Sequence, residues 1–360
     1  MAVWVRFVVI TFVILVATIA APNARAAPFA YITNNFSQNV SVIDTATNTT
    51  IATIPVGLNP RGVAVTPDGS KVFVANLSSD NVSVIDTATN SVSATIPVGS
   101  VPYGVAVTPD GTKVYVGNAN SNTVSVIDVA TNTVTATVTV GTSPRGIAVL
   151  PSGSRVYVAN FDSDSVSVID VATNTVIDTI AAPLLEPFGV AVTPDGTKLY
   201  VTNSGTNSMS VFNTATNSVA TTLTVGTSPL GVALTPDGSK AYVANYISAS
   251  ASVIDISTDL VIGSVAVGSY PVGVSVSPNG SEVYIANSIS NNVSVVSTAT
   301  DTVGAVVGVG ASPYAFGQFI GPAAAAPSIP TLQEAAVAAM AFLLALIGVL
   351  MMRRRRLSAS

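Results

Sequence analysis

The stretch Pro102-Tyr-Gly-Val-Ala-Val-Thr-Pro-Asp-Gly-Thr-Lys-Val-Tyr-Val-Gly-Asn118 is the cleanest copy of a unit that the chain repeats. Two more apolar runs follow it, at Val124–Asp128 and Thr133–Gly141. The first of these, the third run of the unit, is apolar on alternate residues and is therefore expected to be half-buried. Pro-Asp-Gly turns or their variants begin at Pro67, Pro109, Pro151, Pro194, Pro236 and Pro278, which lie 42 or 43 residues apart. A period near 40 residues with four short β-runs per unit is typical of propeller blades.

The number of runs predicts the topology. The second run of the unit occurs seven times, and its copies are marked by Tyr31, Phe73, Tyr115, Tyr157, Tyr200, Tyr242 and Tyr284. The first run has six full copies and a late one at 313–319. We therefore predict an all-β, seven-bladed β-propeller of four-stranded antiparallel blades, in which the C-terminal inner strand (313–320) completes the N-terminal blade (29–57). Such a closure leaves no unpaired sheet edge.

Composition excludes several kinds of chemistry. The 360 residues contain no Cys and no His. Disulfides, thiol nucleophiles, Cys or His ligation of zinc or haem, and the commonest general base are thereby removed. Between Ala27 and Pro327 there are 17 acidic and 7 basic residues, a net charge of −10. An acidic domain repels phosphate backbones, so nucleic acid is not an expected partner, and no cofactor is expected.

The N-terminal 26 residues read as a signal peptide. Arg6 supplies a positive start, 7–21 form an apolar core, and Ala24-Arg25-Ala26 fits a cleavage site, so the mature propeller domain is expected to span 27–320. The alternatives are a buried first strand or an uncleaved anchor.

The C-terminus carries signals of its own. An Ala/Pro linker (321–328) leads to Ile329-Pro330-Thr331-Leu332, 18 uncharged residues (335–352) and four Arg (353–356). As a helix the uncharged segment is about 27 Å long, enough to cross the hydrocarbon core. Because basic flanks stay cytoplasmic, the propeller is expected to face outward, anchored in the inner membrane.

Two resemblances follow from these residues. Tyr200-Val-Thr-Asn203, with its counterparts at 31–34 and 157–160, resembles the YVTN family of β-propeller repeats, found in microbial surface-layer and exported proteins. The tail resembles an IPTL-type sorting signal (329–360) of Gram-negative bacteria, although Ala335 stands where that family usually has Trp. The second resemblance implies recognition by an exosortase-like membrane peptidase and final placement in the outer membrane, at the cell surface or outside the cell. A plain membrane anchor is the alternative.

Residues that vary between repeats are the candidates for binding. Antiparallel strands place the loop after each Val-Ala-Asn run and the loop between blades on one face, where nearly all the variation occurs. The position between Pro and Gly of the inner strand holds Arg61, Tyr103, Arg145, Phe188, Leu230, Val272 and Tyr314 in turn. We expect a ligand site at the channel mouth formed by Arg61, Tyr103, Arg145, Phe188 and Tyr314, widened by Phe161 and Tyr246. Arg and aromatic side chains suit an acidic or sugar-like ligand. The alternative is that these side chains only plug the channel.

The leading functional hypothesis is an exported, non-enzymatic propeller at the bacterial envelope. Its variable face would bind a glycan, a peptide or a neighbouring protein. The alternative is a periplasmic propeller enzyme, lactonase-like or redox-associated, that uses an Asp/Arg/Tyr site. Asp162 and Asp164, with Asp80, suggest a calcium site only weakly, since they lack a glycine-turn loop, and no metal is expected.

Overall fold

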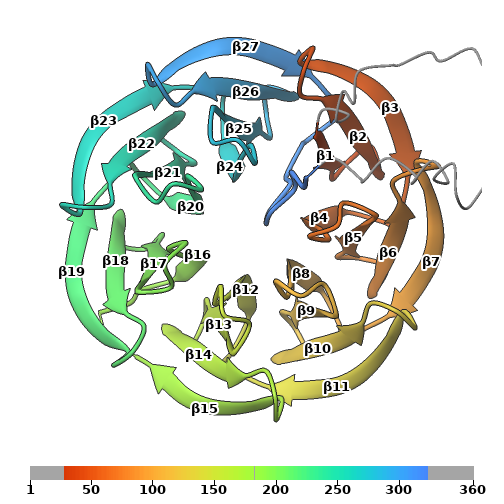
Figure 1. Cartoon of the computed structure of the whole chain (residues 1–360), viewed down its shortest axis with the longest axis horizontal. Coiled ribbons are helices and arrows are strands. Elements are labelled where there is room, and N and C mark those ends of the chain that lie inside the picture. Colours follow the sequence, from red (N-terminus) through yellow and green to blue (C-terminus); the bar gives the residue numbers. More distant parts are fainter. Residues whose placement is uncertain (1–27, 182, 323–360) are drawn as a thin grey trace, which may run out of the picture.

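A computed structural model describes residues 28–181 and 183–322 of the protein. Within these ranges the chain forms 27 strands in seven sheets, arranged in a ring around a central axis (Figure 1). The predicted seven-bladed, all-β architecture is confirmed. No helix in the described ranges is long and apolar enough to cross a membrane. The predicted signal peptide, the sorting motif and the helix at 335–352 lie outside the described residues.

The first four blades follow one another from the N-terminus. Blade 1 has three named strands, β1 (Phe29–Asn34), β2 (Asn39–Asp44) and β3 (Thr49–Pro55). Blade 2 has β4 (Pro60–Val65), β5 (Lys71–Asn76), β6 (Asn81–Asp86) and β7 (Ser91–Pro97). Blade 3 has β8 (Pro102–Val107), β9 (Lys113–Asn118), β10 (Thr123–Asp128) and β11 (Thr133–Thr139). Blade 4 has β12 (Pro144–Val149), β13 (Arg155–Asn160), β14 (Ser165–Asp170) and β15 (Thr175–Ile180).

The last three blades repeat the same order. Blade 5 has β16 (Pro187–Val192), β17 (Lys198–Asn203), β18 (Ser208–Asn213) and β19 (Ser218–Thr224). Blade 6 has β20 (Pro229–Leu234), β21 (Lys240–Asn245), β22 (Ser250–Asp255) and β23 (Leu260–Ala266). Blade 7 has β24 (Pro271–Val276), β25 (Glu282–Asn287), β26 (Asn292–Ser297) and β27 (Thr302–Gly308).

Each blade is an antiparallel meander that runs from the channel to the outer wall. In blade 3, for example, Tyr115 lies opposite Val126, and Val126 lies opposite Ala136. A β-bulge shifts the register between the two outermost strands of all seven blades. Bulges strengthen the local twist, so the outer strand turns around the wall of the ring.

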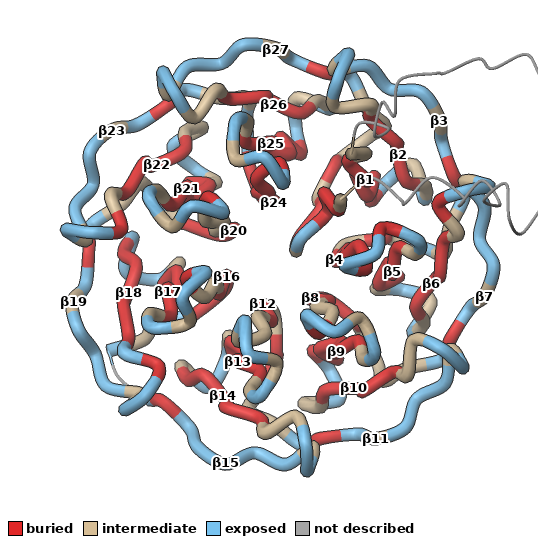
Figure 2. The backbone as a smooth tube through the Cα atoms, viewed as in Figure 1, coloured by how far each residue is buried: buried red, intermediate tan, exposed pale blue. Residues whose placement is uncertain are grey.

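The two middle strands of each blade are buried on both faces, because a neighbouring blade packs on each side (Figure 2). The alternating pattern of the third run suggested a half-buried strand, and this prediction is wrong. Its Ser residues are buried too, since they hold the Asn that ends the second strand. In blade 5 the Asn203 Nδ2 donates to Ser208 Oγ at 3.1 Å and to Ser210 Oγ at 2.9 Å.

Polar side chains also link consecutive blades. Tyr242 of β21 donates to Asp301 Oδ1 at 2.5 Å, and Lys240 Nζ lies 2.7 Å from Asp301 Oδ2 in the outer turn of the next blade. Tyr284 of the last blade donates in the same way to Asn48 of the first, at 2.6 Å. In four blades the Tyr of the repeat motif therefore joins one blade to the next, through Tyr115, Tyr200, Tyr242 and, across the point of closure, Tyr284.

The ring closes through residues 313–320, as predicted, but not as a regular strand. Tyr314 N–H donates to Thr33 O, and Tyr31 N–H donates to Phe319 O, so both ends of the segment pair with β1. Between them the segment crosses to blade 2, where Phe316 exchanges hydrogen bonds with β4. Ala315 and Gly317 have positive φ angles, which a continuous strand cannot contain. The closing segment therefore connects blades 1 and 2 by hydrogen bonds to both β1 and β4.

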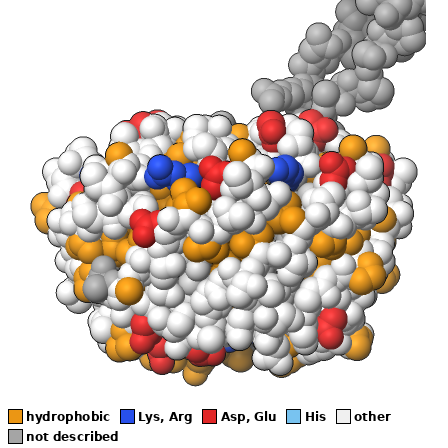
Figure 3. All heavy atoms as spheres, turned by 90° about the horizontal axis from the view of Figure 1, so that it is seen from below, with side chains coloured by type: hydrophobic (Ala, Val, Ile, Leu, Met, Phe, Trp, Pro, Cys, Tyr) orange, Lys and Arg blue, Asp and Glu red, His pale blue; other side chains and the backbone are white. Residues whose placement is uncertain are grey.

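The propeller has two unlike faces. We call the face with the Pro-Asp-Gly and Thr-Asn turns the turn face, and the opposite one the loop face. Pro28 accepts a hydrogen bond from the turn residue Thr45. Gly321 lies against Val65 at the end of β4 and, with Pro322, lines the cavity that the repeated turn prolines border, so the described chain begins and ends at the turn face. Seen from the side, hydrophobic side chains form a broken band around the wall between the faces (Figure 3).

Candidate functional site

The candidate site lies on the loop face, at the inner end of the blades. Arg61, Tyr103 and Arg145 are each the second residue of an inner strand, β4, β8 and β12. The repeated Pro before each of them is preceded by a residue with positive φ, such as Val101 before Pro102. This fixed turn aims each of the three variable side chains at the channel mouth.

Tyr103 is the centre of the site. Its ring is 2% exposed and lies between two guanidinium groups, with Arg145 Cζ 4.5 Å and Arg61 Cζ 5.3 Å from the ring centroid. Arg61 Nη1 also donates to the Tyr103 hydroxyl at 3.2 Å. Cation–π contacts of this kind position both Arg side chains.

Tyr314 of the closing segment completes this arrangement. Arg61 Cζ lies 4.2 Å from the Tyr314 ring centroid, and the hydroxyls of Tyr314 and Tyr103 are hydrogen-bonded to each other. Burial raises the pKa of the Tyr314 hydroxyl well above its ordinary value, so it stays protonated at neutral pH. Burial by itself would lower the pKa of Arg61, but the two phenolic oxygens raise it overall, and the guanidinium stays charged.

Beside the arginines an apolar layer blocks the channel. Phe188, Leu230, Val272 and Phe316 are buried there, and the Phe188 and Phe316 rings are 5.2 Å apart. Phe161 joins the layer to the site, since its ring is 6.0 Å from Phe188 and 5.3 Å from Arg145 Cζ. Both sequence interpretations describe part of this arrangement: the apolar members plug the channel, and the two arginines beside them are partly exposed.

The structure brings the seven candidate residues together: five belong to one apolar cluster, with Tyr246 among its partly buried members, and Arg61 and Arg145 stack on its rings. Sequence reasoning missed Phe316, which fills the plug, and Tyr270, whose ring lies 4.6 Å from that of Tyr246. Phe316 could have been predicted from the sequence, because it lies two residues after Tyr314 in the late inner run. Tyr270 could also have been predicted as a candidate, because its position varies between blades and holds Asn, Val, Ser or Glu in the others.

The two arginines carry charge that the described part of the chain does not balance. In the described ranges the salt bridges are Lys198–Asp259 and Lys240–Asp301, both at the turn face. The Nε atoms of Arg61 and Arg145 are buried, and no hydrogen-bond acceptor for either lies within the described residues. Two positioned guanidinium groups without a carboxylate can accept an anion, and a planar carboxylate fits them best.

The loop carboxylates have structural partners. Asp80 Oδ1 accepts the N–H of Val101, and Asp164 Oδ1 accepts that of Glu186, both at 2.8 Å. Asn207 makes the same bond to Ser228. Since an amide replaces the carboxylate without loss of the contact, these Asp residues belong to the architecture. Across residues 28–181 and 183–322 no group of three metal-binding side chains comes together.

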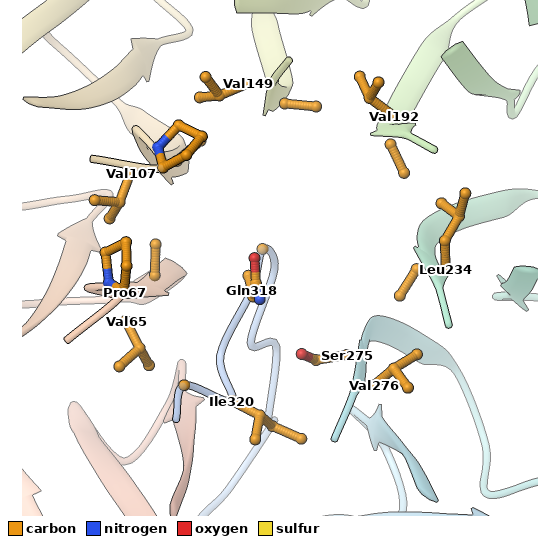
Figure 4. A pocket seen from close by; sticks show the side chains of 18 of the residues that line it. Val65, Pro67, Val107, Val149, Val192, Leu234, Ser275, Val276, Gln318 and Ile320 are labelled. Carbon is orange, nitrogen blue, oxygen red and sulfur yellow. The ribbon is translucent and has the colours of Figure 1, made fainter. Parts of the chain in front are cut away.

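The turn face holds a cavity of about 530 Å³ at the other end of the channel (Figure 4). Rings of repeated residues line it, among them Val107, Val149 and Val192, and Gln318 of the closing segment projects into it. Nearly the same apolar residues occur in every blade, which argues for a structural channel. The variation that marks recognition lies at the loop face.

Comparison with known proteins agrees with this geometry. A family model for YNCE-like β-propellers matches residues 2–121 and 98–238, and the IPTL-CTERM motif matches residues 327–356. The fold and the terminal motif define the class as exported propellers with a C-terminal sorting signal. The chain belongs to the YNCE-like β-propeller family. Both resemblances seen in the sequence are thereby confirmed. No curated protein matches the sequence.

Solved structures share the fold. A chain of hydrazine synthase from Kuenenia stuttgartiensis is 27% identical with a TM-score of 0.71, over 75% of this chain and 92% of that one. A protein of unknown function from Desulfotomaculum acetoxidans is 19% identical with a TM-score of 0.72, over 82% and 98%. The dihydro-heme d1 dehydrogenase NirN is 16% identical with a TM-score of 0.59, over 78% and 63%. The last two comparisons concern the fold alone.

Proposed function

We propose that the protein is a non-enzymatic binding module of the bacterial envelope that recognises a carboxylate-bearing ligand through its loop face. The observation that carries the proposal is the pair of uncompensated guanidinium groups of Arg61 and Arg145, stacked on Tyr103. Cation–π stacking fixes each group, and among the described residues the side-chain hydrogen bond that they make is the one from Arg61 Nη1 to the Tyr103 hydroxyl. Arg is seldom used as filler.

The sorting motif supports display at the envelope. The described chain ends at the turn face, so a chain held by its C-terminus presents the loop face away from the point of attachment. In this proposal an exosortase-like membrane peptidase recognises Ile329–Leu332 after the propeller has crossed the inner membrane. The binding site then faces away from the point of attachment, toward partners in the surroundings.

Binding is tested with two carboxylate polymers, polygalacturonate and polyglutamate, and with uncharged dextran as a negative probe. Affinity for the carboxylate probes should fall at least tenfold in Arg61→Ala and in Arg145→Ala, because each change removes a charged donor. Arg155→Ala is the matched control, since Arg155 lies at the start of β13 at the turn face, where it donates to Thr214 O. Equal binding by all three variants would refute the site.

Display is tested by the intact mass of the protein from each envelope fraction. A species that starts near Ala27 and ends near Thr331, in outer-membrane or released material, is expected. A species that retains Arg353–Arg356 in the inner membrane would refute sorting and leave a tethered periplasmic protein.

The similarity to a chain of hydrazine synthase favours a second candidate, a redox-associated propeller. A sequence without Cys and His offers no His or Cys ligand for haem, so such a role would depend on a separate redox partner. If purified protein turned over a substrate and Arg61→Ala with Arg145→Ala abolished turnover, the binding-module proposal would fail.

A further inference from the structure

One position of the loop face departs from the repeat in three consecutive blades. It is the second residue after the buried Asn of each blade, and in blades 1 to 7 it is Phe36, Ser78, Asn120, Asp162, Gly205, Ile247 and Ile289. Because blade 7 is followed by blade 1, the three large apolar residues lie in three adjacent blades of the seven.

The backbone at this position is the same throughout. In every blade its N–H donates to a carbonyl of the preceding inter-blade connection, as in Phe36 to Ala311, Ser78 to Leu58 and Ile289 to Ser269. This backbone hydrogen bond therefore forms whether the residue is Ser, Asn, Asp, Gly, Ile or Phe, and the fold does not require an apolar side chain here. The choice of Phe and Ile in adjacent blades needs another explanation.

These side chains are exposed. Phe36 is 71%, Ile289 61% and Ile247 57% accessible. Tyr270, also partly exposed, lies between Ile247 and Ile289, since its carbonyl accepts the N–H of Ser288. We call Phe36, Ile247, Tyr270 and Ile289 the apolar arc. Exposed apolar residues that gather in one place mark an interaction surface.

The apolar arc is continuous with the arginine site. Tyr270 packs edge-on against Tyr246, which lies against the aromatic cluster. Arg61 in turn stacks on Tyr314, next to the connection that Phe36 contacts. A ligand bound at the arginines can therefore reach the arc by way of Tyr246 and Tyr270.

Two other kinds of partner fit less well. A polysaccharide would bury hydroxyl groups against Ile247 and Ile289, which offer neither hydrogen bonds nor a ring face, and this is costly. An anionic membrane would cover the whole face and be repelled by its carboxylates, among them Asp80, Asp162, Asp164 and Glu186. An acidic polypeptide with apolar side chains matches both halves of the surface, charge to charge and apolar to apolar.

We propose that the ligand of the loop face is an extended polypeptide segment whose carboxylate binds between Arg61 and Arg145 and whose apolar side chains lie on the apolar arc. This inference rests on the proposed function, because it uses the same arginines, and it specifies the partner.

The test uses the full chain, recovered from the envelope and held in lipid nanodiscs. A library of random 12-residue peptides is selected against it, with empty nanodiscs as the subtraction. A peptide of this length reaches about 40 Å when extended. Selected sequences should combine Asp or Glu with Leu, Ile, Val, Phe or Trp, and the best one is synthesised with a fluorophore for anisotropy measurements.

The decisive variant is Phe36→Ser, Ile247→Ser, Ile289→Ser, which copies the Ser78 of blade 2 and so preserves folding. We expect at least a tenfold loss of affinity for the synthetic peptide. The matched control is Ile177→Ser, Leu260→Ser, Ile262→Ser, which removes three exposed apolar residues of β15 and β23 on the wall and should leave affinity unchanged. Circular dichroism melting verifies that both variants are folded.

The outcomes separate the two proposals. If Arg61→Ala removes peptide binding and the arc variant does not, the function stands and the apolar arc is refuted as the docking surface. If the arc variant weakens binding and both Arg variants do not, the carboxylate site and this inference fail together. Selected peptides without the acidic and apolar combination, or arc-dependent binding to phosphatidylglycerol vesicles, would also overturn the inference.

Discussion

At the scale of single residues, the repeat allows each position to be compared with the equivalent position in the other blades. Val101 illustrates this, because its φ is +57° in a position that Asn59 occupies one blade earlier with φ +51°. A β-branched residue in the left-handed region is strained, whereas Asn tolerates it. The Asn of one blade therefore indicates a substitution that should relieve the backbone strain at Val101 in the next.

Val101→Asn should stabilise the protein by about 1 kcal/mol, because the strain is removed and the backbone bonds of the turn are kept. In thermal unfolding followed by circular dichroism, Tm should rise by about 2 °C. Val92→Asn in β7 is the control and should not raise Tm. A lower Tm for Val101→Asn would contradict the strain argument.

The turn carboxylates predict how stability changes with pH. A hydrogen bond from Thr108 lowers the pKa of Asp110 below 3.8, and one from Thr193 does the same for Asp195. A lowered folded pKa contributes stability that is complete above the unfolded pKa and is lost as pH falls through the folded pKa. The protein should therefore lose stability from about pH 4 downward.

Asp110→Asn with Asp195→Asn should reduce this acid loss and leave Tm at pH 7 nearly unchanged. Asn279 shows why, since it accepts the same turn bonds, from Ser277 Oγ at 2.7 Å and Ser281 N at 3.0 Å. Tm is measured from pH 7 to pH 2, with the exposed loop residue Asp162→Asn as control. An unchanged slope in the double variant would rule out these carboxylates as the cause.

At the scale of strands and turns, the inner strand explains the Gly of the repeat. Adjacent inner strands approach so closely that a Cβ at Gly104 would lie 2.0 Å from the carbonyl oxygen of Arg145. The same contact recurs around the ring, for example between Gly62 and Tyr103 O. The glycine thus permits the close packing that holds the variable residue before it at the channel mouth.

Gly104→Ala should destabilise the protein by at least about 2 kcal/mol, since backbone must shift to admit the methyl group. Gly308→Ala is the matched control, because a Cβ there meets no atom within 4 Å. Both are compared by thermal unfolding. Equal Tm values for the two variants would refute the close-packing explanation.

At the scale of the whole molecule, stability depends on a segment that is distant in sequence from the blade it completes. Phe319 is fully buried in a core that joins residues of β1, β4 and β25. The closing segment also supplies Tyr314 and Phe316 to the candidate site. Closure and binding are therefore built from the same eight residues, 313–320.

Phe319→Ala should cost about 3–5 kcal/mol, because it leaves a cavity where the ring closes. Phe36→Ala removes the same atoms from an exposed position and should change stability by less than about 0.5 kcal/mol. Denaturant unfolding of both variants provides the comparison. A small effect of Phe319→Ala would mean that blade 1 is stable without its closing segment.

The sequence determined the blade count, the antiparallel meander, the closure between the chain ends and the face that carries the variation. It could do so because the repeat period and the turn residues are local signals that recur seven times. It also named the seven candidate residues, since variation within a repeat is visible without coordinates.

Only the tertiary structure decided how those residues meet. The stacking of Arg61 and Arg145 on Tyr103, the burial of Phe188 and the crossing of Phe316 to β4 all depend on strands that are far apart in the chain. The apolar arc likewise appears only when closure puts blade 7 beside blade 1. Contacts of this kind are set by packing across the ring, which no local pattern encodes.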